Sequence, residues 1–159
     1  MNLTPSRSYL IKALHEWMTD NDLTPYLAVD ARVQGVMVPD QFTRDEQLVL
    51  NISYSAVQGL LVDHEGVSFS ARFGGVPMNV FIPLAAILAI YAKENSQGMG
   101  FGMEPGSDEL MHYASISSDL ENSDEGKESK GLVSIDNGTE KSHPGKKPKS
   151  GKPNLTVIK

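Results

Sequence analysis

The feature that most limits what this chain can fold into is the point at which its apolar residues stop. From residue 1 to 102 the sequence is rich in Val, Leu, Ile, Ala and aromatic residues, whereas from Met103 onward Ser, Gly, Glu, Asp, Lys and Pro take over. A segment with few large apolar side chains cannot bury enough surface to stay folded by itself. We therefore expect one folded domain over residues 1–102 and a flexible linker over residues 103–150.

The net charge of −6 is unevenly distributed along the chain. Residues 1–102 contain 10 acidic and 6 basic residues, 103–140 contain 10 and 2, and 141–159 contain 6 lysines and no acid. This charge pattern suits a solvated tether better than a packed core. The final segment, GKPNLTVIK over 151–159, brings large aliphatic side chains back. Such side chains at the end of a tether usually need a partner to cover them.

The opening segment, TPSRSYLIKALHEWMTDN, predicts an N-terminal helix, with Thr4 as its N-cap and Pro5 in the first helical position. Apolar residues recur at helical spacing and form a stripe two residues wide: Tyr9, Leu10, Ala13, Leu14, Trp17 and Met18. This stripe covers either the core of the domain or a second copy of the chain, and both interpretations remain open.

After the helix the pattern changes to short β-prone runs: Tyr26–Ala31, Val33–Val38, Gln47–Ile52, Ala56–Val62, Gly66–Phe73 and Val76–Ile82. Turn residues separate most of them, and this spacing is typical of a small antiparallel barrel or sandwich. The segment PLAAILAIYAKEN, residues 83–95, then predicts a short second helix, and Gly98–Gly102 a flexible linker. The expected fold is thus α+β and mainly β.

No pattern in the chain predicts catalysis. There is no cysteine, no serine lies in a strand–turn–helix context, and His15, His64, His112 and His143 lack the spacing of metal ligands. His15 is expected to be a polar residue on the flank of the helix. We therefore expect that the protein is not an enzyme and that it binds no cofactor and no metal.

No apolar run reaches 18 residues and the N-terminus does not resemble a secretory signal, so we expect a cytoplasmic location without a membrane partner.

Several segments, in the same order along the chain, resemble the SspB family. They are SYLIKALHEWMTDNDLTPYLAVD, VQGVMVP, RDEQLVLNIS, FSARFGGVP and the final GKPNLTVIK. The resemblance implies an Sm-like or SH3-like β-barrel that forms a homodimer through its N-terminal helix. It also implies an adaptor that binds the ssrA degradation tag on proteins from stalled ribosomes and delivers them to the protease ClpXP, with the ribosome as a further candidate partner.

The resemblance assigns roles to three sets of residues. The peptide-binding set is Phe42, Ser70, Ala71, Arg72, Phe73, Gly74, Gly75 and Met78. The dimer-interface set is Tyr9, Leu10, Ala13, Leu14 and Trp17. The set that binds the N-terminal domain of ClpX is Pro153, Leu155, Val157, Ile158 and Lys159. The glycine pair Gly74-Gly75 also has the composition of a hairpin turn, and both roles can hold together.

Two other functions compete with the adaptor. Small β-barrels also bind RNA, and a starvation-induced, transcription-associated regulator of that kind is the main alternative. The net charge of −4 over residues 1–102 argues against direct nucleic-acid binding. The other alternative is a structural dimer without a ligand groove.

Overall fold

The computed structural model describes residues 3–112 and 133–135. Most of the expected linker and the whole segment 151–159, with its predicted ClpX-binding residues, lie outside the described residues. Among the residues that are described, no helix is both long enough and apolar enough to cross a membrane.

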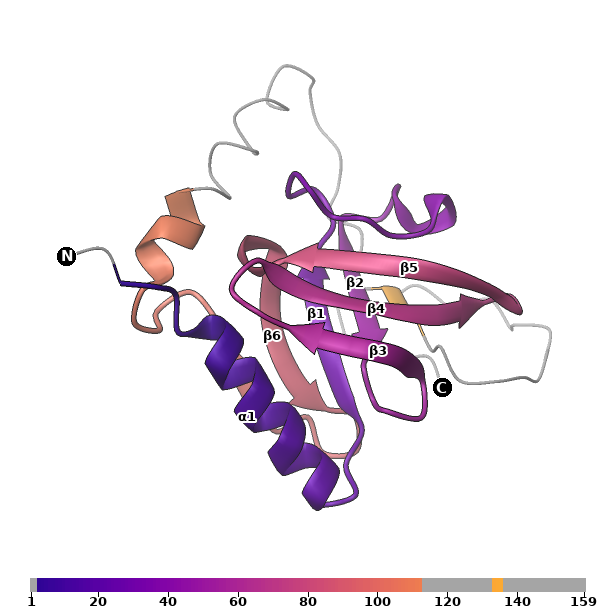
Figure 1. The fold of residues 1–159 in the computed structure, drawn as a ribbon, viewed down its shortest axis with the longest axis horizontal. Helices are drawn as coiled ribbons and strands as arrows, with labels where there is room; N and C mark the ends of the chain where they lie inside the picture. Colours follow the sequence, from indigo (N-terminus) through magenta and orange to yellow (C-terminus); the bar gives the residue numbers. More distant parts are fainter. Residues whose placement is uncertain (1–2, 113–132, 136–159) are drawn as a thin grey trace, which may run out of the picture.

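The N-terminal helix, α1, runs over Arg7–Asp20 and lies along one side of the strands (Figure 1). Its buried residues are Arg7, Ser8, Ile11, His15 and Met18, which follow helical spacing and form the face turned toward the core. Of the apolar stripe expected from the sequence, only Met18 is fully buried, at 0% exposure. The remaining stripe residues lie beside the buried face and are half-buried or exposed.

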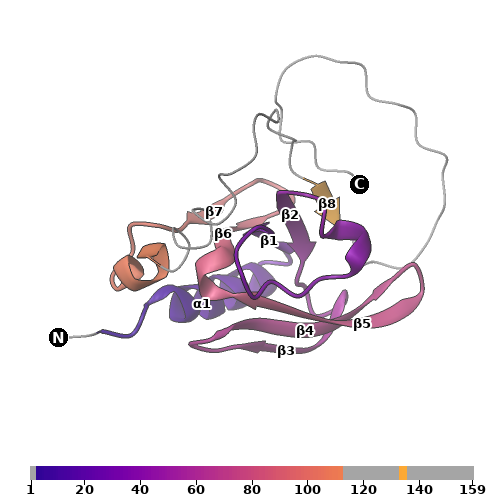
Figure 2. The same cartoon turned by 90° about the horizontal axis from the view of Figure 1, so that it is seen from above.

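The strands form two sheets, which Figure 2 shows as two layers. One sheet has the order β7-β6-β1-β2-β8 and the other β3-β4-β5. Their bounds are β1 Pro25–Asp30, β2 Gln47–Asn51, β3 Val57–Val62, β4 Gly66–Phe73, β5 Val76–Pro83, β6 Ile87–Ala92, β7 Gly98–Gly100 and β8 Val133–Ile135. Every pair is antiparallel except β2 with β8. The expected mainly β fold with an N-terminal helix is confirmed, but as two sheets; no closed barrel is found among the described strands.

The core lies between the inner faces of the two sheets. Leu27, Leu50 and Ile90 from the first sheet and Val67 and Ile82 from the second are all 0% exposed. Apolar residues alternate with more exposed ones along β4, as expected for a strand with one buried face. A large apolar side chain contributes about 1.5–3 kcal/mol when it is fully buried, so this shared interior holds the two layers together.

The second helix predicted over residues 83–95 is wrong. Instead, a single 3-10 turn, Leu84–Ala86, leads into strand β6. The strand pairs with β1 on one side and with β7 on the other, so it lies in the interior of its sheet. A short strand in such a position is apolar throughout, and a continuous apolar run cannot be told from a buried helix by its periodicity.

Two further sequence-based expectations also differ from the structure. The run Val33–Val38 is not a strand, because only Met37 forms a bridge, to Phe81. Gly98–Gly102 is not a loose linker, because its first three residues form β7. Gly98 is required there, since an added Cβ would lie 2.0 Å from the carbonyl oxygen of Ile90.

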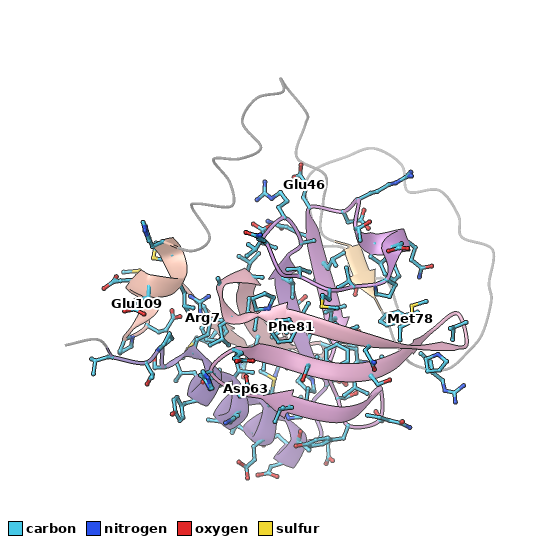
Figure 3. All side chains as sticks on the ribbon, turned by 45° about the horizontal axis from the view of Figure 1, so that its top comes forward. Arg7, Glu46, Asp63, Met78, Phe81 and Glu109 are labelled. Carbon is cyan, nitrogen blue, oxygen red and sulfur yellow. The ribbon has the colours of Figure 1, made fainter. Side chains whose placement is uncertain are left out.

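Packing against the domain continues past Gly102. The Nε of Arg7 donates to Glu104 Oε1 at 2.5 Å, and its Nη1 donates to the carbonyl oxygens of Leu84 and Ile87 at 2.8 and 3.1 Å. Glu104 also accepts from the Gly102 N–H, at 2.6 Å. These contacts attach the segment after β7 to the start of α1, close to the helical residues 107–112 that include Glu109 (Figure 3).

Candidate functional site

The hairpin that joins β4 to β5 contains most of the predicted peptide-binding residues. Phe73 pairs with Val76, so Gly74 and Gly75 alone form the turn. Their φ angles of 58° and 82° are both positive, as a two-residue hairpin turn of type I′ requires. An added Cβ would meet nothing within 4 Å at either position, so backbone conformation rather than space favours glycine. The turn interpretation of this glycine pair is confirmed.

Strand alternation divides the predicted peptide-binding residues between two faces of the three-stranded sheet. Ala71, directly opposite Met78, and Phe73 lie on the inner face. Phe42, from the 3-10 turn Asp40–Phe42, joins them, with its ring centroid 5.7 Å from that of Phe73. Ser70 and Arg72 occupy the alternate positions and lie on the outer face. One extended peptide on one face therefore cannot contact all of these side chains.

The inner face becomes exposed toward the hairpin turn. Val80 is 2% exposed, Met78 is 37% exposed, and Val76, the last residue before the turn, is 53% exposed. Figure 3 shows Met78 well along β5 toward this end. We call the apolar surface formed by Phe42, Val76 and Met78 the hairpin patch. Ala71 and Phe73 are 5% and 6% exposed and belong to the core behind this patch.

Val76 was not predicted from the sequence, although a signal for it was present. A two-residue turn at Gly74-Gly75 places Val76 opposite Phe73, and it therefore lies on the same face. Counting outward from the turn would have placed Val76 on this face. The same count places Arg72 on the other face, where its Nη1 lies 3.4 Å from the Gly75 carbonyl oxygen.

The hairpin patch lies beside the edge of a sheet. β5 pairs with β4 on one side, and on the other side Phe81 exchanges two backbone hydrogen bonds with Met37, at 2.8 and 3.0 Å. By alternation, the backbone groups of Asn79 and Pro77 also face this edge. Among the described residues, no strand pairs with β5 there. Proline has no N–H to satisfy, so Pro77 is well placed on such an edge.

This geometry suits an extended peptide. A peptide backbone can pair with Asn79 at the edge of β5, and its alternate side chains can then contact Met78 and the rest of the hairpin patch. The surface offers apolar contact and backbone hydrogen bonds. Within residues 3–112 and 133–135, no three His, Asp or Glu side chains lie close enough together to hold a metal ion.

A second apolar surface lies on α1, and we call it the helix face. It consists of the five residues predicted for a dimer interface: Tyr9, Leu10, Ala13, Leu14 and Trp17. Tyr9 is 63% and Trp17 is 42% exposed. Leu14 and Trp17 also line an open hollow with Ser96 and Gln97 from the connection between β6 and β7 and with Gly98 at the start of β7. The five residues thus share one surface of α1, although Leu14 also packs against the edge of the main core.

Two buried ionisable residues of α1 were not recognised from the sequence. His15 is 3% exposed, and its Nε2 donates to the carbonyl oxygen of Ile52 at 2.7 Å, so its expected place on the helix flank is wrong. Arg7 is 4% exposed. Their partners lie far away in the sequence, and no local pattern indicates such pairs.

Comparison with known proteins gives two findings. The family model described as stringent starvation protein B matches residues 5–159. A protein of Haemophilus influenzae (strain ATCC 51907 / DSM 11121 / KW20 / Rd), named stringent starvation protein B homolog, is 47% identical over 107 residues. That alignment covers 67% of this chain and 71% of the relative. The match to the family model includes both apolar surfaces and the segment 151–159.

Proposed function

Because this chain belongs to the stringent starvation protein B family, we propose that it is an adaptor that binds ssrA-tagged proteins and delivers them to ClpXP. The observation that carries this proposal is the hairpin patch, an exposed apolar surface next to the stretch of β5 at Pro77 and Asn79 with which no described strand pairs. An unfolded degradation tag is an extended peptide, which is the kind of ligand such an edge accommodates. We place the protein in the cytoplasm, where tagged proteins from stalled ribosomes arise.

Delivery requires a second contact, which we assign to the C-terminal segment. Residues Pro153, Leu155, Val157, Ile158 and Lys159 would bind the N-terminal domain of ClpX. The expected linker 103–150 has 48 residues, of which 38 follow the part that packs on the domain. A flexible chain of 38 residues has an r.m.s. span of about 31–37 Å. Tethering at this range gives an effective concentration on the order of millimolar, so a weak encounter between tag and unfoldase becomes frequent.

We further propose that the helix face forms a homodimer. A monomer would leave the large aromatic side chains Tyr9 and Trp17 partly exposed next to an open hollow. Association of two such faces would remove this surface from water. A dimer carries two tails, which strengthens ClpX binding if both can bind at once.

The assignment of the hairpin patch is tested by replacing Met78 with Asp. Burying a methionine side chain against a ligand contributes about 1.5–3 kcal/mol, so we expect tag affinity to fall about ten-fold or more. The measurement is fluorescence anisotropy with a labelled tag peptide. Met78 is 37% exposed, so the substitution leaves the core intact.

An Ala71→Gln variant would also be expected to block the tag. Because Ala71 is 5% exposed, however, the larger side chain would also overpack the core, and the two effects would not be separated.

The matched control is Ser70→Asp, which introduces the same charge on the opposite face of the same hairpin. We expect it to leave tag affinity within about two-fold, since surface substitutions away from a site usually have small effects. If Ser70→Asp weakens binding while Met78→Asp does not, the tag lies on the outer face and the proposed site is wrong.

The helix face is tested by replacing Leu14 with Asp. A carboxylate in the middle of an apolar interface loses its hydration, so we expect the variant to sediment as a monomer at micromolar concentration where the wild type is a dimer. Thr19→Asp is the control, because Thr19 is exposed on α1 outside the helix face. A wild-type protein that is itself monomeric under these conditions would contradict the proposed dimer.

A further inference from the structure

The two edges of the five-stranded sheet differ in character. One edge is β7, a three-residue strand whose residues are all exposed. The next strand in from the other edge is β2, in which Leu48 and Leu50 are 0% and Val49 is 3% exposed. If β2 were itself the edge strand, its backbone N–H and C=O groups would lie unpaired beside buried apolar side chains. An edge of that kind readily pairs with another extended segment.

A segment from beyond the domain occupies this edge. β8 pairs with β2 in parallel, and residues 133, 134 and 135 lie opposite Leu48, Val49 and Leu50. Figures 1 and 2 show β8 next to β2 at the end of the sheet. All other strand pairs among the described residues are antiparallel and form within residues 25–100. β8 is therefore an addition to a sheet that is otherwise built within the domain.

Three features make this contact weaker than the other strand pairs. β8 is three residues long. Parallel pairing is slightly less stable per residue than antiparallel pairing. The Oγ of Ser134 is buried and has no hydrogen-bond partner among the described residues, which disfavours the docked position. Contacts of this kind open at a small fraction of the free energy of global unfolding.

We propose that the outer edge of β2 is a docking site for the chain's own segment 133–135, and that docking and release of this segment change the reach of the C-terminal tail. With the segment docked, the chain between it and the segment 151–159 is 15 residues long, compared with the 38 residues 113–150 after release, since residues up to 112 pack on the domain. A flexible chain of 15 residues spans about 19–23 Å, compared with about 31–37 Å for 38 residues. The consequence for delivery, although not the docking itself, rests on the proposed adaptor function.

Hydrogen exchange in the full-length protein, without tag or ClpX, tests the docking. A Val133→Asp/Ile135→Asp variant replaces the two residues that pair with Leu48 and Leu50 by aspartate, which is disfavoured in strands. We expect the β2 amides that face away from β1 to exchange about ten-fold or more faster in this variant, as local opening becomes easier. The amides of β4 should be unaffected, which would show that the domain remains folded.

The control is Val157→Asp/Ile158→Asp, which makes the same chemical change in the same tail outside the docked segment. Exchange in β2 should match the wild type in this control.

The Ser134→Val variant should change the exchange rate in the opposite direction. It removes the unpaired hydroxyl and adds a β-branched side chain, so the β2 amides should exchange more slowly than in the wild type. Equal exchange in the wild type and in the Val133→Asp/Ile135→Asp variant would overturn the proposal, as would equal acceleration by both Asp pairs.

The outcome for tail reach is measured separately in a ClpXP degradation assay. The Val133→Asp/Ile135→Asp variant and the Ser134→Val variant should differ from each other in the protein concentration that gives half-maximal stimulation of degradation. Identical curves, together with the expected exchange results, would overturn the effect on reach and leave the docking site in place. If the wild-type protein gives no stimulation at all, the adaptor function fails, whereas the exchange results still decide the docking.

Discussion

Removal of residues 151–159 should abolish stimulation of ClpXP and leave tag affinity unchanged. The segment contains Leu155, Val157 and Ile158, the last cluster of large aliphatic residues in the chain. Burying two or three of them would supply a few kcal/mol, from about 1.5–3 kcal/mol for each. Ordering the segment opposes this gain, so each tail should bind weakly and delivery should depend on tethering. The measurement is the degradation rate of a tagged reporter at low concentration.

The truncated protein should also protect the reporter, because it still covers the tag without presenting it to ClpX. The matched control removes residues 141–149, which are also nine in number and include four of the six terminal lysines. This control shortens the tether and reduces its positive charge but keeps the terminal segment, so it should retain most of the stimulation. Acceleration of degradation by the protein lacking 151–159 would show that the tail does not connect the adaptor to ClpX.

The sequence predicted best those elements whose signal is local. β4 was predicted with its bounds, Gly66–Phe73, because alternating burial and the Gly74-Gly75 turn both lie within the same short segment. The helix face could also be derived from spacing alone, since its residues recur at helical intervals. Spacing could not decide whether this stripe or its neighbour faces the core. The buried face includes Arg7 and His15, and a polar residue inside a core gives no apolar signal.

The sequence failed where distant segments determine the structure. Residues 87–92 form a strand because β1 and β7 pair with them on both sides, and neither partner can be inferred from the run itself. The division of the predicted peptide-binding residues between two faces was already contained in strand alternation. The resemblance to a family named those residues as one continuous segment, and alternation separates Ser70 and Arg72 from Ala71 and Phe73. The exposed end of the patch at Val76 follows from the same register.

The clearest long-range feature is the ion pair between Arg7 and Glu104, and replacing Arg7 with Met should lower the free energy of unfolding by about 3–5 kcal/mol. The two side chains are 4% and 6% exposed. Loss of the guanidinium would leave the Glu104 carboxylate buried beside an apolar group and deprive the carbonyl oxygens of Leu84 and Ile87 of their donor. The measurement is urea unfolding at fixed protein concentration, since the stability of the proposed dimer would depend on concentration.

Glu104→Gln separates the charge of this pair from its packing and gives a test in pH. Burial raises the pKa of Glu104, but hydrogen bonds from the Gly102 N–H and from Arg7 outweigh it and hold this pKa below its ordinary value. A carboxyl group with a lowered pKa in the folded state stabilises the protein above its pKa in the unfolded chain, about 4.3. That stabilisation is lost as the pH falls through the lower, folded-state pKa. The stability difference between wild type and Glu104→Gln should therefore shrink as the pH falls below about 4.

Two results would show that this pair does not anchor the segment after β7 to α1. One is a stability difference between wild type and Glu104→Gln that stays constant between pH 7 and the acid transition. The other is an Arg7→Met variant as stable as the wild type.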